Sequence, residues 1–283
     1  MEQFASGWKR NYYGKADVSV YRLRRDGKAA PGENPVFAAN FKMLVYGEAF
    51  WPIYTAGDNT GLIATDSMKN FIQREALNYV GFDLEECCHF LAAKFLQTYP
   101  QVDGVQVSCA ELPYSSLAGD RVSFTPSSPE RATARIELNR AGIVEAASGI
   151  QGFKLLRVAG SAFQGFVRDQ YTTLPEAANR PLHMWLDAEW LYTALPAGSG
   201  SGAVTAKVRR LVHEVFCGFE SASIQQMIHQ IGTNILAGIP AISEIHLEAT
   251  NRTWETVVER GNEIGVYTEP RPPYGCVGLR LRR

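Results

Sequence analysis

The chain opens with two stretches, residues 17–23 and 37–50, in which apolar and polar side chains alternate. A period of two is typical of strands that bury one face. The connection between them, residues 27–35, contains glycine and proline. We therefore expect a long antiparallel hairpin.

Two helices are predicted to follow this hairpin. The first is expected to begin near Asp66, a residue type that caps helix N-termini. The second is expected to begin at about Asp83. The apolar residues that share one side of each helix are Phe71, Ile72, Ala76, Leu77 and Val80 in the first, and Leu84, Cys87, Cys88, Leu91, Phe95 and Leu96 in the second. Strand patterns return at residues 104–112 and 132–138, whereas residues 114–129 show no clear period.

The second half of the chain repeats this order. Strand patterns cover residues 153–166 and 182–192, and stripes at helical spacing cover residues 204–219 and 224–236. Two more strands are expected at residues 242–247 and 277–281. Residues 196–202 are rich in glycine and serine, so we interpret them as a flexible loop inside this half.

The order strand-strand-helix-helix-strand-strand thus occurs twice, with a join expected within residues 140–152. Hairpin strands with grouped helices predict an α+β fold, in which antiparallel sheets carry helices on one face. We place the two halves at residues 10–145 and 146–283. Open sheet edges in such a fold favour assembly with further copies.

Composition narrows the class of protein. The 283 residues are 46% hydrophobic and 20% charged, with a net charge of -1, which favours a globular protein without a nucleic-acid partner. No apolar run is long enough for a membrane span, and the first ten residues lack the apolar core of an export signal. We therefore expect a cytoplasmic protein whose five cysteines are reduced, buried thiols.

Familiar metal and nucleotide motifs are missing from the sequence. The five histidines are scattered, and no Cys-x-x-Cys pair, glycine-rich dinucleotide motif or P-loop occurs. These observations predict no metal site.

Polar residues gather instead in three segments: Tyr13-Gly14-Lys15, the stretch 57–70, and the stretch 163–174 followed by Arg180. Thr65 and Asp66 lie where a helix is expected to begin, and the free N–H groups of a helix N-terminus suit an anionic ligand. The residues alone leave plainer interpretations open. Asp66 would then be a helix cap, Lys15 a solvated charge and Arg180 a surface ion-pair partner.

The same segments resemble the urate oxidase (uricase) family. The blocks are Tyr13-Gly14-Lys15, the Ala-Thr-Asp-Ser-Met-Lys-Asn run at 64–70 and the Gly-Phe-Val-Arg-Asp-Gln-Tyr-Thr-Thr-Leu run at 165–174, in the family's order and at roughly its spacing. The resemblance extends from about residue 10 to the C-terminus. It implies two tandem T-fold halves, a homotetramer with active sites between subunits, and oxidation of urate by O2 without a cofactor.

The resemblance also implies how the purine is held. Phe163 would stack on the flat ring. Arg180 and Gln225 would bind the pyrimidinedione edge, the first with a two-pronged guanidinium and the second as both donor and acceptor. Leu174 and Ile224 would form apolar walls.

The reacting side of the site is implied to be shared between subunits. Thr65 and the backbone N–H of Asp66 would come from the neighbouring subunit and hold the five-membered ring. Asn251 would lie above the ring, where O2 or water binds. Lys15 would pair with Thr65 to move protons.

One position departs from the family pattern. A histidine is expected two residues after Asn251, where it completes a Lys-Thr-His proton relay, but this chain has Thr253. Threonine can pass a proton through water but cannot hold a positive charge near neutral pH. The purine-binding residues are therefore present while the proton relay is altered.

Three hypotheses follow. In the first, the protein is a urate oxidase in which Lys15, Thr65, Thr253 and water handle protons. In the second, it is a related oxidase that acts on a modified urate-type purine or stops at another product. In the third, it is a non-catalytic purine or pterin binder, or a scaffold. The missing histidine-built zinc site weighs against a pterin-handling relative, and a pure binder has little need of the Lys15–Thr65 pair.

Overall fold

The computed structural model describes residues 11–25, 35–120, 122–196, 200–261 and 263–283. The chain forms two compact units: Met1–Ser148 with Ala194–Gly202, and Gly149–Thr193 with Ala203–Arg283. Strand β7 (Gly142–Phe163) runs from the first unit into the second. The region expected to hold a join is therefore continuous strand. Residues 146–150 of β7 are all buried, so the sequence shows no alternation of apolar and polar residues that would have predicted a strand there.

The first unit begins with the predicted hairpin. β1 (Tyr13–Leu23) pairs antiparallel with β2 (Val36–Tyr46), which pairs with β3 (Gly104–Glu111), and β3 pairs with β6 (Arg131–Asn139). The prediction that the second strand reaches residue 50 is wrong. The chain instead forms a 3-10 turn, η1 (Glu48–Phe50), and helix α1 (Trp51–Ala56). Pro52 explains the change, because proline suits a first helical turn and cannot donate to a strand ladder.

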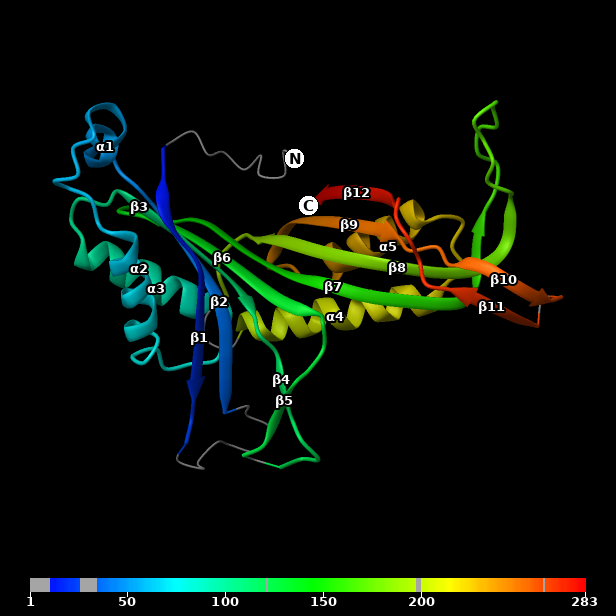
Figure 1. Cartoon of the computed structure of the whole chain (residues 1–283), viewed down its shortest axis with the longest axis horizontal. Coiled ribbons are helices and arrows are strands. Elements are labelled where there is room, and N and C mark those ends of the chain that lie inside the picture. The colour runs from blue at the N-terminus through cyan, green and yellow to red at the C-terminus, as the bar shows by residue number, and fades with distance from the viewer. Residues whose placement is uncertain (1–10, 26–34, 121, 197–199, 262) are drawn as a thin grey trace. The chain divides into compact units, whose positions relative to one another are not determined.

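Helices α2 (Thr65–Glu75) and α3 (Leu84–Thr98) lie beside this sheet (Figure 1), with α2 against β1 and α3 against β3 and β6. The prediction for α3 is confirmed, since its whole apolar stripe is buried. The prediction that Asp66 caps α2 is wrong, because Ala64 holds the cap position. Helix α2 also ends before Leu77 and Val80, which are 80% and 93% exposed instead of buried.

A short hairpin occupies the region without a predicted conformation. It consists of β4 (Tyr114–Ser116) and β5 (Phe124–Pro126). The core of the first unit lies between the sheet and α3. Its fully buried side chains include Phe41 and Met43 of β2, Ile136 of β6, and Leu91 and Phe95 of α3.

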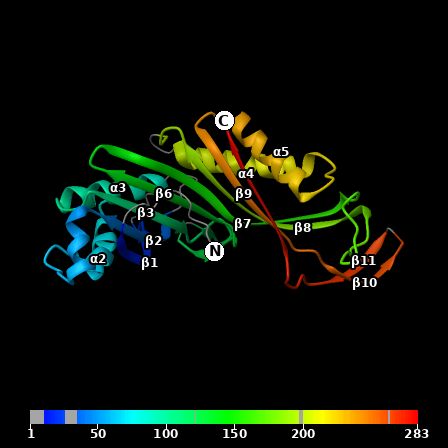
Figure 2. The ribbon, with the colours of Figure 1, turned by 90° about the horizontal axis from the view of Figure 1, so that it is seen from above.

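The second unit has the same plan. From Gly149 onward β7 is followed in the sheet by β8 (Ala177–Tyr192), β9 (Ile242–Asn251) and β12 (Gly275–Arg282). Helices α4 (Gly200–Gly218) and α5 (Ile224–Gly238) lie on one side of these strands (Figure 2). Alternate residues of β8, among them Leu182, Met184 and Leu186, are buried. The expected loop 196–202 is helical from Gly200, and residues 197–199 lie outside the described part of the chain.

A second hairpin, β10 (Glu255–Arg260) with β11 (Ile264–Thr268), was not predicted. All residues of β10 are exposed, so no buried face imposes a period on its sequence.

All five cysteines are free. Cys87, Cys88 and Cys109 are buried as expected, but the same expectation is wrong for Cys217 and Cys276, which are exposed.

Candidate active site

The predicted site residues fall into two groups, one in each compact unit. The first group is on β1 and α2, and the second is on β7, β8, α5, the end of β9 and the loops after β7 and β9. The members of the first are Lys15, Thr65 and Asp66, and those of the second are Phe163, Leu174, Arg180, Ile224, Gln225, Asn251 and Thr253.

The first group is assembled by contacts between β1 and the segment that leads into α2. The hydroxyl of Tyr13 accepts a hydrogen bond from the Ile63 N–H at 3.0 Å, and the Tyr13 ring packs edge-on against Phe50 at 5.1 Å. Ile63 lies two residues before Thr65, the first residue of α2. The strand that carries Lys15 and the helix that begins at Thr65 are therefore fixed to each other.

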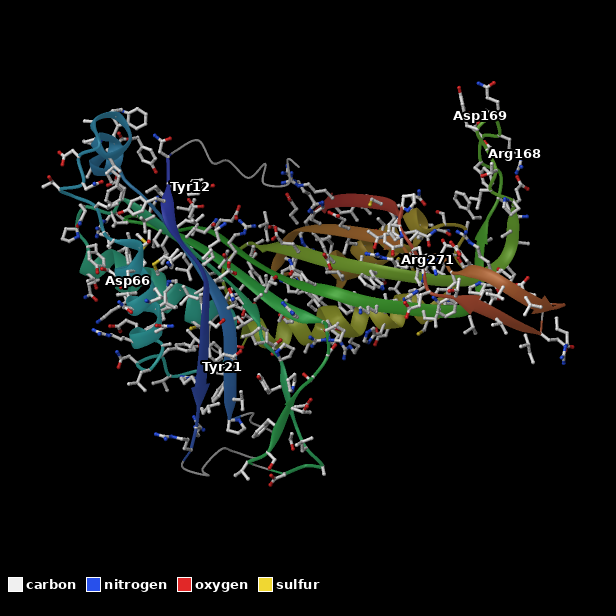
Figure 3. All side chains as sticks on the ribbon, in the orientation of Figure 1. Tyr12, Tyr21, Asp66, Arg168, Asp169 and Arg271 are labelled. Atoms are coloured by element: carbon white, nitrogen blue, oxygen red, sulfur yellow. The ribbon has the colours of Figure 1, made fainter. Side chains whose placement is uncertain are left out.

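The N-terminus of α2 is left open by its own side chains. Ala64 cannot cap the helix, and Asp66 turns toward Lys69 at 2.6 Å and Asn70 at 2.9 Å. Lys69 is the main cause that lowers the pKa of Asp66, and Lys15 adds to it. The charge of Lys15 is thus felt at the helix N-terminus, where uncapped N–H groups favour an anion. Asp66 stands exposed on α2 in Figure 3.

Strand β1 is irregular next to Lys15. The pairing with β2 shifts between Lys15 and Val18, and Asp17 has a left-handed φ of 57°. Bulges of this kind redirect neighbouring side chains and are frequent beside functional sites. On the other side of Lys15, Gly14 approaches β2 so closely that a Cβ there would lie 1.9 Å from the Met43 carbonyl oxygen.

The second group centres on Phe163 and Arg180. The guanidinium carbon of Arg180 lies 5.3 Å from the centroid of the Phe163 ring. The Arg180 Nε is buried and has no hydrogen-bond partner among the described residues, and burial lowers the pKa of this guanidinium. A buried donor without a partner is costly unless a ligand supplies an acceptor.

Phe163 is held by a partner that the sequence did not point out. The Phe166 ring stacks on it at 4.9 Å with an interplanar angle of 17°, and this contact fixes the plane of Phe163. The cation of Arg168 lies 5.7 Å from the Phe166 ring. Figure 3 shows Arg168 and Asp169 on the loop that projects beyond β7. Leu174, in the same loop, is 45% exposed and its carbonyl accepts from Arg168 at 3.3 Å.

Hydrogen bonds tie the start of α5 to the end of β7. Ser221 receives a bond from the Ala162 N–H at 2.8 Å and donates its own N–H to Gly160 at 3.1 Å. The N-cap Ser223 accepts from the Gln226 N–H at 3.1 Å. These bonds bring the first turn of α5 to β7 beside Phe163. In that turn Ile224 is buried and Gln225 is exposed, as an apolar wall and an available amide require.

Asn251 is the last residue of β9, paired with Met184 of β8 and Gly275 of β12. The chain leaves the sheet immediately afterwards, and Thr253 is exposed.

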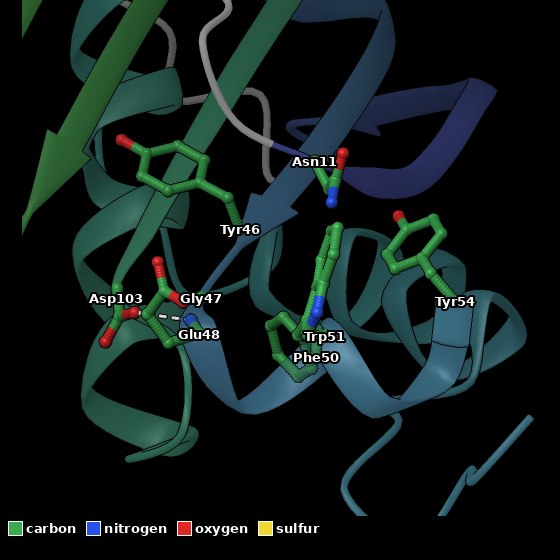
Figure 4. A pocket seen from close by; sticks show the side chains of 8 residues that line it. All are labelled: Asn11, Tyr46, Gly47, Glu48, Phe50, Trp51, Tyr54 and Asp103. Atoms are coloured by element: carbon green, nitrogen blue, oxygen red, sulfur yellow. Dashed lines mark hydrogen bonds between the residues drawn. The ribbon is translucent and has the colours of Figure 1, made fainter. Parts of the chain in front are cut away.

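A pocket of about 410 Å³ lies elsewhere in the first unit (Figure 4). None of the predicted site residues lines it. Its lining residues are Asn11, Tyr46, Gly47, Glu48, Phe50, Trp51, Tyr54 and Asp103.

A family model described as Uricase matches residues 11–137 and 146–278, almost the whole chain. The chain belongs to the uricase family. It is 36% identical to a uricase of Haloferax volcanii over 96% of this chain and 97% of that protein. It is also 38% identical to the uric acid degradation bifunctional protein PucL of Bacillus subtilis, over 96% of this chain.

The chain spans 60% of the length of that bifunctional protein and 58% of a second one, from Bacillus sp. TB-90. Among solved structures, a uricase from Bacillus fastidious superposes with a TM-score of 0.85 at 34% identity, covering 98% of this chain and 94% of the other. Urate oxidase from Bacillus sp. TB-90 superposes with a TM-score of 0.85 at 33% identity, covering 96% and 100%. The predicted α+β architecture of two tandem T-fold halves is confirmed.

In this uricase-family chain His183 does not take the place that Thr253 leaves. His183 is on β8 next to this segment, where its ring lies 5.4 Å from Trp254. Met184, the partner of Asn251, is fully buried, so strand alternation turns His183 to the opposite face from Asn251. Burial and the charges of Arg252 and Lys154 lower the pKa of His183.

Sequence reasoning missed Phe166 and Arg252, which contact functional segments. Phe166 lies inside the recognised block 165–174 and Arg252 adjoins Asn251, but their contacts depend on strand register and loop path. Within the described ranges, no cluster of three metal-ligating side chains occurs, and no helix is long and apolar enough to cross a membrane.

Proposed function

We propose that this chain oxidises urate with O2 and water to 5-hydroxyisourate and hydrogen peroxide, without a cofactor. Family membership supports the reaction class. The observation that carries the proposal is the Arg180 guanidinium beside Phe163, with a buried Nε that lacks an acceptor. A planar anion with an edge of carbonyl and N–H groups would supply that acceptor and stack on an aromatic ring at once.

The purine-binding roles follow from this placement. Phe163, kept in plane by Phe166, stacks on the purine, and Arg180 and Gln225 bind its pyrimidinedione edge. Ile224 and Leu174 close the apolar sides. Because all five residues belong to one unit, the unit can hold the ring in a single orientation.

The proton chemistry is assigned to the first group. Thr65 and the N–H of Asp66 bind the five-membered ring at the open N-terminus of α2, whose dipole favours the urate anion. Lys15 takes and returns protons through Thr65 and ordered water. Asn251 holds O2, and later water, above the ring.

The assembly is part of the proposal. We infer a homotetramer in which Lys15, Thr65 and Asp66 of one subunit complete the site of its neighbour, and a cytoplasmic location. The halves 10–145 and 146–283 would be the two T-fold repeats of each subunit.

Thr253 favours one alternative, an oxidase acting on a modified urate-type purine. An acid–base group typically contributes about 10²–10⁴ in rate, so its loss slows urate oxidation without abolishing it. Introducing histidine, Thr253→His, should therefore raise the rate with urate. No gain in a folded variant would show that the altered relay does not limit the rate.

Two variants test the assignment. Lys15→Met removes the ammonium group but nearly keeps the side-chain length, so urate consumption should be lost while urate binding without oxygen stays within about threefold of the wild type. Arg180→Gln should instead weaken binding, because it removes a charged donor.

The control is Lys94→Met, which changes an exposed lysine on α3. Urate absorbance in air gives turnover, and titration calorimetry under nitrogen gives binding. A Lys15→Met variant as fast as the wild type would overturn the proton role. Unchanged binding in Arg180→Gln would overturn the purine site.

A further inference from the structure

Arg252 follows Asn251 directly and is held in an unusual way. Its guanidinium carbon lies 3.9 Å from the centroid of the Trp185 ring and 3.7 Å from that of Tyr274. Cation–π contacts extend to about 6 Å, so both rings are in close contact with the cation. In the part of the chain that the structure describes, no carboxylate pairs with this guanidinium.

Hydrogen bonds fix the rest of the residue. The Arg252 Nε donates to the Thr250 hydroxyl at 3.2 Å, and its backbone N–H donates to the His183 carbonyl at 2.8 Å. The two rings are anchored as well. The Tyr274 hydroxyl donates to the Pro270 carbonyl at 3.0 Å, and the Lys154 ammonium lies 4.5 Å from the Trp185 ring.

These contacts join β8, β9 and the segment before β12 at the point where β9 ends. Asn251 is the last paired residue, and the backbone from Arg252 to Trp254 belongs to no strand. Arg252 holds this backbone just past Asn251 and just before Thr253. The Arg252 side chain contacts Thr250 and Trp185, which strand alternation places on the face opposite Asn251, so Arg252 acts on the face of Asn251 through the backbone alone.

We propose that Arg252, stacked between Trp185 and Tyr274, is a positioning residue that fixes Asn251 and Thr253 over the reacting ring. The proposal rests on the proposed urate oxidation. We call the stack of Arg252 between Trp185 and Tyr274 the arginine clamp. Phe163, Arg180 and Gln225 bind other parts of the purine. Loosening the clamp therefore leaves urate binding intact and slows the oxygen-dependent step.

The clamp requires a planar cation. Guanidinium stacks flat on an aromatic ring, whereas the compact ammonium of lysine does not. Arg252→Met should therefore lower kcat by about 10- to 100-fold, the loss expected when a reacting group moves by up to 1 Å. KM and anaerobic urate binding should change by less than about threefold. Arg252→Lys should restore only part of kcat although it restores the charge.

Tyr274 supplies a matched pair that leaves Arg252 in place. Tyr274→Phe loses the hydroxyl bond to Pro270 but keeps the ring that contacts Arg252, so kcat should stay within about threefold of the wild type. Tyr274→Leu removes the ring and should lower kcat as Arg252→Met does. The double variant Arg252→Met with Tyr274→Leu should be no slower than the slower single variant, because both changes break one contact. Arg210→Met is the control, since Arg210 is an exposed arginine on α4.

The experiment measures kcat, KM, anaerobic urate binding and melting temperature for the full-length protein and these variants. The clamp is supported if kcat alone falls in Arg252→Met and Tyr274→Leu while kcat of Tyr274→Phe stays within about threefold of the wild type. If Arg252→Met does not fold, the two Tyr274 variants decide. Wild-type kcat in folded Arg252→Met or Tyr274→Leu would overturn this inference alone. Failure of both the wild type and Arg210→Met to consume urate would instead overturn the proposed function, and the inference with it.

Discussion

A single methyl group at Gly14 should disturb the position of Lys15. Gly14 pairs with Leu44 on β2, and Lys15 pairs with Met43. The Cβ of Gly14→Ala would lie 1.9 Å from the Met43 carbonyl oxygen and 2.9 Å from the Leu44 Cα. Both are backbone atoms, so no side-chain rotation relieves the clash.

The size of the disturbance follows from these distances. Non-bonded carbon and oxygen atoms approach to about 3 Å at the closest, so β1 must move away from β2 by about 1 Å next to Lys15. Overpacking of this kind typically costs about 1–3 kcal/mol, and misplacing a reacting group by 1 Å costs about 100-fold in rate. We expect Gly14→Ala to lose both stability and turnover, with the larger effect on kcat.

The assay compares kcat for urate and the melting temperature with those of Gly278→Ala. Gly278 is also a strand glycine, in β12, but a Cβ there meets nothing within 4 Å. The control should keep kcat within about twofold, as exposed substitutions usually do. Wild-type kcat and stability in Gly14→Ala would refute the close approach of β1 to β2. A loss of stability with unchanged kcat would refute the dependence of turnover on the position of Lys15.

Three further predictions concern stability and thiol reactivity. Burial, followed by the charges of Glu85 and Glu86, raises the pKa of Asp83 to about 6, so the folded state binds this proton more tightly than the unfolded state and loses stability as pH rises from about 4 to 6. Asp83→Asn should then raise the free energy of unfolding by about 1 kcal/mol at pH 7.5, a value reduced for solvent screening, and should leave it unchanged near pH 4. Urea unfolding at the two pH values checks this, and an equal gain at both would contradict it. In the native protein iodoacetamide at pH 8 should label only Cys217 and Cys276, because burial raises the pKa of Cys87 and Cys88 and Cys109 is buried too; mass spectrometry should find two labels before unfolding and five after it, and a third label on the folded protein would contradict the burial. Arg140 donates hydrogen bonds to the carbonyl of Leu96 in the last turn of α3 and to those of Tyr99, Pro100 and Val102 just after the helix. Arg140→Ala should therefore lower the free energy of unfolding, measured in urea, by about 2 kcal/mol. Arg131→Ala, at an exposed position, should lower it by less than about 0.5 kcal/mol. Equal effects of the two substitutions would contradict the capping role of Arg140.

Much of the fold follows from periodicity, where one face of an element is buried. Helix α3 and the paired strands β3 and β6 have a buried face, and their boundaries match the predictions within one or two residues. The pattern fails where burial is not one-sided. Residues 146–150 of β7 are buried at five successive positions, and β10 is exposed at every position.

The candidate site was predictable in its residue types but not in its contacts. Arg180 and Phe163 were selected through motifs, and they do lie together. The stacking of Phe166 on Phe163 depends on the path of a loop. The clamp around Arg252 joins residues that are 67 and 22 positions away in the chain, Trp185 and Tyr274, and only the strand pairing brings them together.

The central claim is most directly tested by following urate loss and peroxide formation together, in air-saturated buffer with a metal chelator. The account predicts steady loss of urate, one hydrogen peroxide for each urate consumed, and no effect of the chelator. Urate that binds but is not consumed would contradict it, and would turn the assignment toward a modified purine as the substrate of the same site.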